Sequence, residues 1–269
     1  MTEMDKSFTG SIPALYEKYL VPLFFAPYAA DLALRVADLT HGRLLEEAAG
    51  SGAVTRALAR TLPDSVEIVA TDLNQPMLDL AKSTLQGRSI VWRQADACAL
   101  PFEDNAFDVI VCQFGVMFFP DKLKAFRESR RVLKPSGMFL FNVWDGIGEN
   151  DFAFVVNETM ADLFPQDPPR FFARVPHAYH DTGEIKATLA AGGFDRVEVE
   201  AVERRSRAAS PLDAAIGLCQ GTPLRNEIES RDPERLEEAT VTTAAALSAR
   251  FGAGAIEGKM RALVVTATR

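Results

Sequence analysis

The sequence predicts an α/β fold built on a doubly wound, mostly parallel sheet, and three observations lead to this prediction. Short apolar runs alternate with longer segments of helical periodicity between residues 44 and 144. Proline and glycine mark the point where the last of these helices stops and a strand begins. Glycine or aspartate follows each of the first three apolar runs. Such alternation is typical of βαβ units, in which helices cover both faces of a parallel sheet.

The elements of this core follow from the apolar runs and from the periodic segments between them. Strands are expected at residues 43–49, 66–71, 90–94, 107–112 and 137–143. Helices are expected at 53–61, 75–85 and 121–133. The last helix ends before Pro135, which cannot continue it, and Gly137 frees the backbone to turn into the next strand.

Further elements flank the core on both sides. Residues 12–39 carry apolar side chains at helical spacing, so one or two helices are expected there. Residues 145–176 are irregular, aromatic and rich in proline, which predicts an inserted cap, and 182–191 resumes as a helix. Strands at 197–202 and 262–268 are expected to pair as a late antiparallel edge, with a mainly helical excursion between them.

Composition places the 269 residues among ordinary globular proteins, with 48% hydrophobic and 25% charged side chains. The longest apolar runs are interrupted or end at proline, well short of the ~20 residues that span a bilayer. The N-terminus has neither the basic segment nor the uninterrupted apolar segment of a secretory signal. We therefore expect a cytoplasmic protein without a membrane span.

Net charge and cysteine spacing exclude other classes of site. The formal net charge of -8 would repel a phosphate backbone, so nucleic acid is not expected as a partner. Cys98, Cys112 and Cys219 are widely spaced and form no CxxC pair, so we expect buried small side chains rather than disulfides or a zinc site. No metal site is expected, and the oligomeric state is not fixed.

A turn of small residues follows the first expected strand, in the run LLEEAAGSGAVTRAL. The turn Gly50-Ser51-Gly52 would let the backbone approach a ligand closely, and the N–H groups of the helix that begins near Ala53 favour an anionic group. The same glycines could instead only make a tight connection between strand and helix.

Two aspartates follow the next two strands. Asp72 lies 20 residues beyond Gly52 and could accept both hydroxyls of an adenosine ribose, or could instead be a helix cap or turn residue. Asp96 could accept from a purine amino group, or could be a solvated loop aspartate. Because the carboxyl ends of parallel strands share one edge of the sheet, the three positions together favour a nucleoside site.

Four motifs together resemble those of class I S-adenosylmethionine-dependent methyltransferases, in the same order and spacing. These motifs are LLEEAAGSGAVTRAL, IVATDLNQPMLDLA, ADACALPFEDNAFDVIVCQFGVMFFPD and RRVLKPSG. The resemblance covers residues 16–143 and is to the small-molecule branch that includes ubiquinone and menaquinone C-methyltransferases. The N-terminal run LYEKYLVPLFFAPYA is also similar to that branch. The resemblance implies a Rossmann-like fold, S-adenosyl-L-methionine as cofactor and a small-molecule methyl acceptor.

The resemblance also implies which residues bind the cofactor. Glu46 and the backbone from Ala48 through Gly50 to Gly52 would hold the methionine part. Asp72 would bind the ribose hydroxyls.

The sugar, the adenine and the sulfonium would have contacts of their own. Leu73 and Met77 would pack on the sugar and base, and Asp96 with the N–H of Ala97 would bind the adenine edge. The remaining implied residues are Gln113 and Phe114, beside the sulfonium, and Tyr16, which would close over the cofactor.

The pattern of elements along the chain, together with this resemblance, suggests four parts. Residues 1–40 would be a helical segment over the site, 41–145 the cofactor-binding core and 146–181 a cap insertion. Residues 182–269 would complete the core, with a helical insertion between the last two strands.

Two residues depart from the family's pattern. Ala48 replaces the first of three glycines and is tolerable if it keeps a negative φ. Glu47 stands where an apolar strand residue is usual, and an unpaired buried carboxylate is costly. We expect Glu47 either to pair with a basic residue or to reach the mouth of the site.

No catalytic residue is assigned from the sequence. His41, His177 and His180 are the only histidines, and each could be an ordinary turn or packing residue. Aromatic residues of the fourth-strand loop and the cap could wall an apolar acceptor pocket or form the core of the cap. These residues are Phe118, Phe119, Phe152, Phe154, Phe164, Phe171, Phe172 and Tyr179.

Three other functions remain open. A nicotinamide-dependent dehydrogenase shares the glycine turn and the later acid, but its pattern requires Gly or Ala where Thr55 stands. A protein with this fold could also act only as a cofactor-binding or regulatory subunit. Cofactor chemistry other than methylation is the third alternative.

Overall fold

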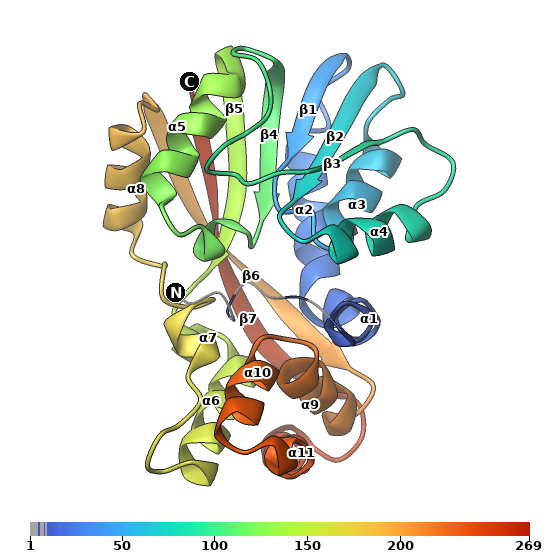
Figure 1. Cartoon of the computed structure of the whole chain (residues 1–269), viewed down its shortest axis with the longest axis vertical. Helices are drawn as coiled ribbons and strands as arrows, with labels where there is room; N and C mark the ends of the chain where they lie inside the picture. The colour runs from blue at the N-terminus through green and yellow to red at the C-terminus, as the bar shows by residue number, and fades with distance from the viewer. Residues whose placement is uncertain (1–4, 6–7, 9) are drawn as a thin grey trace. The chain divides into compact units, whose positions relative to one another are not determined.

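The computed structural model describes Asp5, Phe8 and residues 10–269 (Figure 1). Contacts divide the chain into two compact units. We call residues 27–143, 179–201 and 263–269 the core unit. The helical unit comprises the described residues of 1–26, together with 144–178 and 202–262. Two strands, β6 (Arg196–Ala208) and β7 (Ile256–Thr268), contribute residues to both units.

A seven-stranded mixed sheet has the strand order β3-β2-β1-β4-β5-β7-β6. Its first five strands are β1 (Gly42–Glu46), β2 (Val66–Asp72), β3 (Val91–Gln94), β4 (Phe107–Gln113) and β5 (Leu133–Trp144). Strand β1 pairs in parallel with β2 and β4, β2 with β3, and β4 with β5. Strand β7 runs antiparallel, and β6 beside it forms an edge. The predicted Rossmann-like sheet with a late antiparallel pair is therefore confirmed.

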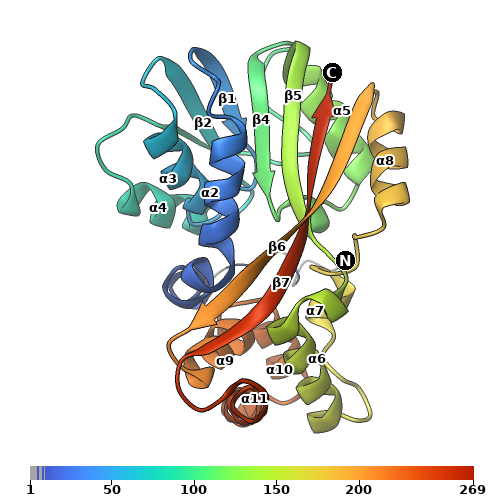
Figure 2. The ribbon, with the colours of Figure 1, turned by 180° about the vertical axis from the view of Figure 1, so that it is seen from behind.

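Helices cover both faces of the sheet in the core unit. They are α2 (Ala26–Arg35), α3 (Ala53–Thr61), α4 (Gln75–Thr84), α5 (Lys122–Val132), α8 (Thr182–Ala191) and the short η3 (Val116–Phe118). Helices α5 and α8 lie on one face (Figure 1), and α2 and α3 lie on the other (Figure 2). Helix α5 buries Phe126, Ser129 and Val132, which recur at helical spacing, and its N-cap Asp121 accepts from the Lys124 N–H at 2.9 Å.

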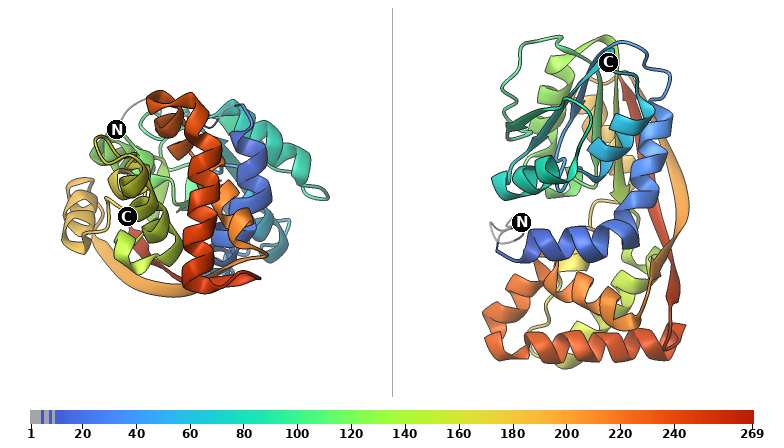
Figure 3. Two further views of the ribbon diagram at one scale, coloured as in Figure 1. Left: turned by 90° about the horizontal axis from the view of Figure 1, so that it is seen from below. Right: turned by 90° about the vertical axis from the view of Figure 1, so that its right-hand side faces the viewer.

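The helical unit contains the remaining helices. They are α1 (Ile12–Leu15), η2 (Tyr16–Phe25), η4 (Ile147–Glu149), α6 (Asp151–Leu163), α7 (Phe171–Arg174), α9 (Pro211–Gln220), α10 (Leu224–Arg231), η5 (Pro233–Arg235) and α11 (Leu236–Phe251). Helix α11 packs against α9 and α6 (Figure 3). The N-terminal helices and the helical excursion between the last two strands are as predicted. The boundaries of the four predicted parts stay a prediction.

The prediction that residues 145–176 are irregular is wrong for residues 151–163. Asp151–Leu163 forms α6, with Phe152, Val155, Val156 and Met160 buried. These positions recur every three or four residues, as a helix with one buried face requires. The prolines that suggested irregular structure begin only after this helix ends.

Strand lengths differ from the prediction at both ends of the core. Strand β1 ends at Glu46 rather than at residue 49, because the chain turns away from the sheet at Ala48, where φ is 53°. Strands β6 and β7 reach 13 residues each, longer than predicted. The three cysteines are free and buried, as expected. Within the part of the chain that the structure describes, no helix has the length and apolar character needed to cross a bilayer.

Candidate functional site

The turn after β1 is held between two neighbouring strands of the core unit. The N–H of Glu47 donates to Val111 O of β4 at 2.9 Å, and the N–H of Ala49 donates to Thr71 O of β2 at 2.8 Å. Gly52, the N-cap of α3, has φ of 84°, in the region that favours glycine. The turn and the start of α3 are thereby fixed at the carboxyl edge of the sheet.

Ala48 adopts a positive φ, so the condition stated for tolerating an alanine at this position, a negative φ, is not met. Its φ of 53° is a left-handed conformation that costs a residue with a Cβ roughly 1–2 kcal/mol. The methyl group lies against Gly115 of the loop after β4: a Cβ on Gly115 would come within 2.5 Å of the Ala48 Cβ and 2.7 Å of the Cys112 Sγ. Packing against a glycine in the neighbouring loop leaves room for the alanine.

Asp72, at the end of β2, binds the glycine turn directly. Its Oδ2 accepts from the Gly50 N–H and its Oδ1 from the Asn74 N–H, both at 2.8 Å. Burial raises the pKa of Asp72, and the N–H donors of Asn74 and Gly50 oppose that shift. The N-cap of α4 is Asn74, so Asp72 is the last residue of β2 and not the cap. Its two oxygens keep lone pairs for further donors.

Glu46 is the second acid at this edge, with only 1% of its surface exposed. Burial raises its pKa to about 8, Thr55 partly offsets that effect, and the charge of Asp72 adds to it. Among the described residues, Glu46 Oε2 and Ser51 Oγ are buried without a hydrogen-bond partner. Buried polar atoms without partners are costly, so this edge is suited to a ligand that carries hydrogen-bond donors.

Asp96 and Ala97 follow β3 at the same edge. The N–H of Ala95 donates to Asp72 O at 3.0 Å, which ties this loop to the end of β2. Asp96 is exposed, and its Oδ1 accepts from the Cys98 N–H at 2.8 Å. The structure thus brings Glu46, Asp72 and Asp96 to the ends of three adjacent parallel strands.

Two apolar residues after β2 lie in different environments. Leu73 is 46% exposed, although its neighbour Asp72 is buried. Met77 of α4 is buried, and a Cβ on Gly50 would lie 3.6 Å from its Cε. Met77 therefore packs beneath the glycine turn, and Leu73 offers an apolar surface next to Asp72.

The end of β4 contains a second strained residue. Phe114 has φ of 51°, and its N–H donates to the side-chain Oδ1 of Asn142 at 2.9 Å. Its ring meets the edge of Tyr28 at a centroid distance of 5.4 Å. Backbone strain of this kind clusters at functional sites. Asn142 was missed in the sequence, although it is polar within the apolar run FLFNVW and could have been found by that signal.

Glu47 pairs with a hydroxyl, so neither of its expected environments is correct. Its Oε1 accepts from Ser129 Oγ of α5 at 2.9 Å, and only 1% of its surface is exposed. Burial raises its pKa to about 8, with Ser129 lowering it and the charge of Glu128 raising it. Glu47 is therefore largely a neutral carboxylic acid at pH 7.

Tyr16 and His177 belong to the helical unit. The ring of Tyr16 stacks on Phe25 at 4.8 Å, and its place over the cofactor stays a prediction. His177 is buried, with Nδ1 2.8 Å from Asp145 O, as for a packing histidine. Among the aromatic residues considered for an acceptor pocket, Phe152 and Phe171 lie in the core of this unit.

A mixed sheet with this strand order, a glycine turn after β1 and acids at the carboxyl ends of β1, β2 and β3 define the class of S-adenosylmethionine-dependent methyltransferases. Residues 45–141 match the methyltransferase domain family. The chain is 32% identical over 168 residues to the ubiquinone/menaquinone biosynthesis C-methyltransferase UbiE of Serratia proteamaculans. The matched region covers 58% of this chain and 67% of the relative. The chain belongs to the class I S-adenosylmethionine-dependent methyltransferases.

Solved structures share the fold. The YcgJ protein of Bacillus subtilis matches with a TM-score of 0.57 and 21% identity, over 90% of this chain and 98% of that one. Phosphoethanolamine N-methyltransferase 2 of Haemonchus contortus, solved with S-adenosyl-L-methionine, matches with a TM-score of 0.61 and 18% identity, over 99% of this chain and 59% of that one. S-adenosyl-L-methionine is the methyl donor of this family. The assignment is to methyltransferases, not to nicotinamide-dependent dehydrogenases.

Proposed function

We propose that the chain transfers a methyl group from S-adenosylmethionine to a small-molecule acceptor by in-line displacement. The observation that carries the proposal is that Glu46 and Asp72 lie buried at the carboxyl ends of the adjacent strands β1 and β2, beside the glycine turn. Asp72 already binds that turn, and Glu46 has a buried oxygen without a partner among the described residues. Donors on the cofactor's methionine and ribose would satisfy these acceptors.

In this proposal, different residues of the core unit bind different parts of the cofactor. Glu46 and the backbone of residues 48–52 hold the methionine part, Asp72 holds the ribose, and Asp96 with Ala97 binds the adenine. Leu73 and Met77 support the sugar and base. The positions of Glu46, Asp72 and Asp96 at the ends of adjacent strands support this assignment.

The cofactor, when bound, supplies an electrophilic methyl group on a sulfonium. The task of the protein is to hold an acceptor atom in line with the bond that breaks, and such positioning is worth roughly 7–11 kcal/mol of barrier. In this proposal Gln113 and Phe114, at the end of β4, line the site beside the sulfonium. The bond from the Phe114 N–H to Asn142 fixes the backbone at that point. A base is needed only where the acceptor atom must lose a proton.

The acceptor class follows from charge and from the relatives. The net charge of -8 disfavours nucleic acid, so a small molecule is proposed. The name of UbiE assigns that relative a C-methylation in ubiquinone and menaquinone biosynthesis. Quinols and phenols are therefore the first acceptors to test, followed by amines and carboxylic acids.

A transfer assay with cofactor labelled on its methyl group tests the proposal. We expect label to appear in at least one small molecule of this panel and to require the folded protein. Tight cofactor binding without transfer to any member of the panel would instead favour a cofactor-binding or regulatory role.

A further inference from the structure

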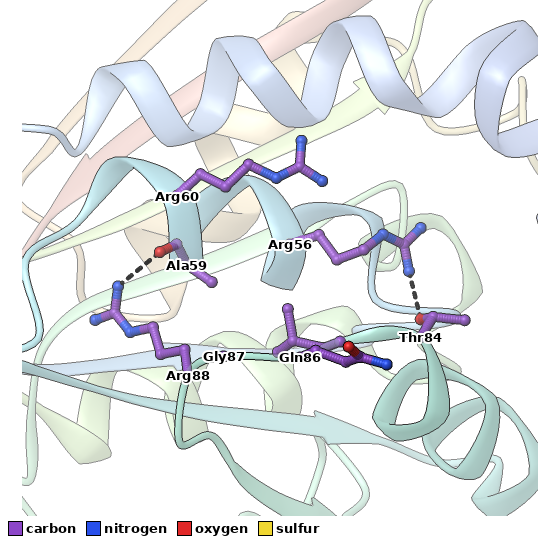
Figure 4. Close-up of a pocket in the computed structure, with 8 residues that line it drawn as sticks. Arg56, Ala59, Arg60, Thr84, Gln86, Gly87 and Arg88 are labelled. Carbon is purple, nitrogen blue, oxygen red and sulfur yellow. Dashed lines mark hydrogen bonds between the residues drawn. The ribbon is translucent and has the colours of Figure 1, made fainter.

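A pocket of about 240 Å³ lies in the core unit, between α3 and the loop that joins α4 to β3 (Figure 4). It belongs to the side of α3 that faces α4, and none of the residues assigned to the cofactor lines it. The lining residues are Arg56, Ala59, Arg60, Thr84, Leu85, Gln86, Gly87 and Arg88.

The lining is cationic in a protein whose net charge is -8. It contains three arginines and no acidic residue. Arg88 already has partners: its Nη1 donates to Ala59 O and Leu62 O, and its Nη2 donates to Pro63 O and Val66 O. Arg88 therefore caps the C-terminal end of α3 and is not the residue that recognises a ligand.

Arg60 and Arg56 are the other two cations of the lining. Arg60 is exposed, and its side chain makes no hydrogen bond or ion pair with any residue the structure describes. Arg56 Nη1 donates to Ser51 O at 2.8 Å and to Thr84 Oγ1 at 2.9 Å. The two side chains lie four residues apart on one helix, and like charges at this spacing repel each other. An anion between them would remove that repulsion.

The loop opposite supplies backbone donors. The N–H groups of Gln86, Gly87 and Arg88 donate to no acceptor among the described residues. Gly87 has φ of 84°, and a Cβ placed on it would meet nothing within 4 Å. Successive free N–H groups around a left-handed residue form a concavity that favours anions.

We propose that this pocket binds a small oxyanion of the phosphate class, with Arg60 as the charged donor, Arg56 adding positive charge beside it and the loop at Gly87 as the backbone donor. Guanidinium groups bind phosphate through charge-assisted hydrogen bonds. The volume admits inorganic phosphate with space left for a small organic substituent. The shared chemistry is a phosphate group, either free or as a phosphate ester.

Calorimetric titration of the full chain with inorganic phosphate tests the proposal, at an ionic strength held constant with sodium chloride. Arg60→Ala is the chosen variant, because Arg56 also binds the cofactor turn at Ser51. We expect phosphate binding to weaken at least about tenfold in Arg60→Ala, the effect of losing one charge-assisted hydrogen bond. Arg127→Ala, an exposed arginine on α5, is the matched control and should bind phosphate as the parent does.

Further measurements distinguish free phosphate from a phosphate ester, and failure of this proposal from failure of the proposed function. Tighter binding of glycerol phosphate than of inorganic phosphate would identify an ester as the ligand, and the reverse order would identify the free ion. The proposal is overturned if phosphate does not bind, if Arg60→Ala binds it as tightly as the parent, or if chloride alone produces the same heat. Adenosylmethionine binding, measured in parallel, should be unchanged in Arg60→Ala, so failure here is distinguishable from failure of the proposed function.

Discussion

Replacing Asp72 by alanine is expected to weaken adenosylmethionine binding at least about 100-fold. In the variant, the two ribose hydroxyls would lose their carboxylate acceptor. Hydrogen bonds to a charged acceptor contribute about 1.5–3 kcal/mol each, and about 1.4 kcal/mol corresponds to a factor of ten in affinity. The same change also removes the acceptor that holds the Gly50 N–H at 2.8 Å. The measurement is the dissociation constant by calorimetry, with thermal unfolding recorded on the same samples.

Two further variants separate a binding effect from a folding effect. Asp72→Asn keeps an oxygen for the Asn74 N–H but removes the charge, so a loss of about tenfold is expected. Asp79→Ala changes an exposed aspartate on α4 and should bind the cofactor as the parent does. Unchanged affinity in folded Asp72→Ala and Asp72→Asn would show that the ribose does not bind here.

Glu47→Gln is expected to remove a large part of the pH dependence of stability. The folded-state pKa of Glu47 is about 8, because burial of its carboxyl outweighs the opposing effect of the hydrogen bond from Ser129, whereas the unfolded value is near 4.5. The folded state therefore holds this proton more tightly, and the stability linked to it is complete below about pH 4.5 and is lost as the pH rises towards 8. Between pH 5 and 8 the loss is on the order of 4 kcal/mol, at 1.36 kcal/mol per unit.

Urea unfolding of parent and variant at pH values from 5 to 9 measures this effect. Glu46, whose pKa is also about 8, contributes a similar slope and stays in both proteins. The groups around Glu47 that carry or could carry charge are Glu128 and Cys112. Glu103→Gln, on an exposed loop, is the control and should keep the full slope. A parent slope retained in Glu47→Gln would show that Glu47 is ionised at neutral pH.

The order of the core elements and the place of the site could be read from the sequence. Apolar runs separated by periodic segments specify parallel strands with crossover helices, and the carboxyl ends of such strands meet at one edge. The positions of Gly50, Asp72 and Asp96 near the ends of successive predicted strands therefore sufficed to predict a shared site at that edge. The bond from the Gly50 N–H to Asp72 confirms that these two residues are in contact, and the bond from the Ala95 N–H to Asp72 O places the loop of Asp96 beside them.

Features that depend on distant contacts were not accessible in this way. The positive φ of Ala48 depends on room beside Gly115, and the neutral state of Glu47 depends on Ser129, 82 residues away. Helix α6 was obscured by the prolines that follow it, although its apolar spacing was present. The run FLFNVW marks Asn142 as unusual, but its partner, the Phe114 N–H, lies at the end of the neighbouring strand and could not be predicted from that run.

A crystal structure with S-adenosylhomocysteine bound is the most direct test of the central claim, that the carboxyl ends of β1, β2 and β3 bind the cofactor. The account predicts both ribose hydroxyls within hydrogen-bond distance of the Asp72 carboxylate, and the methionine part along residues 48–52 beside Glu46. A ribose bound away from Asp72, or a ligand that leaves the glycine turn without contacts, would contradict it.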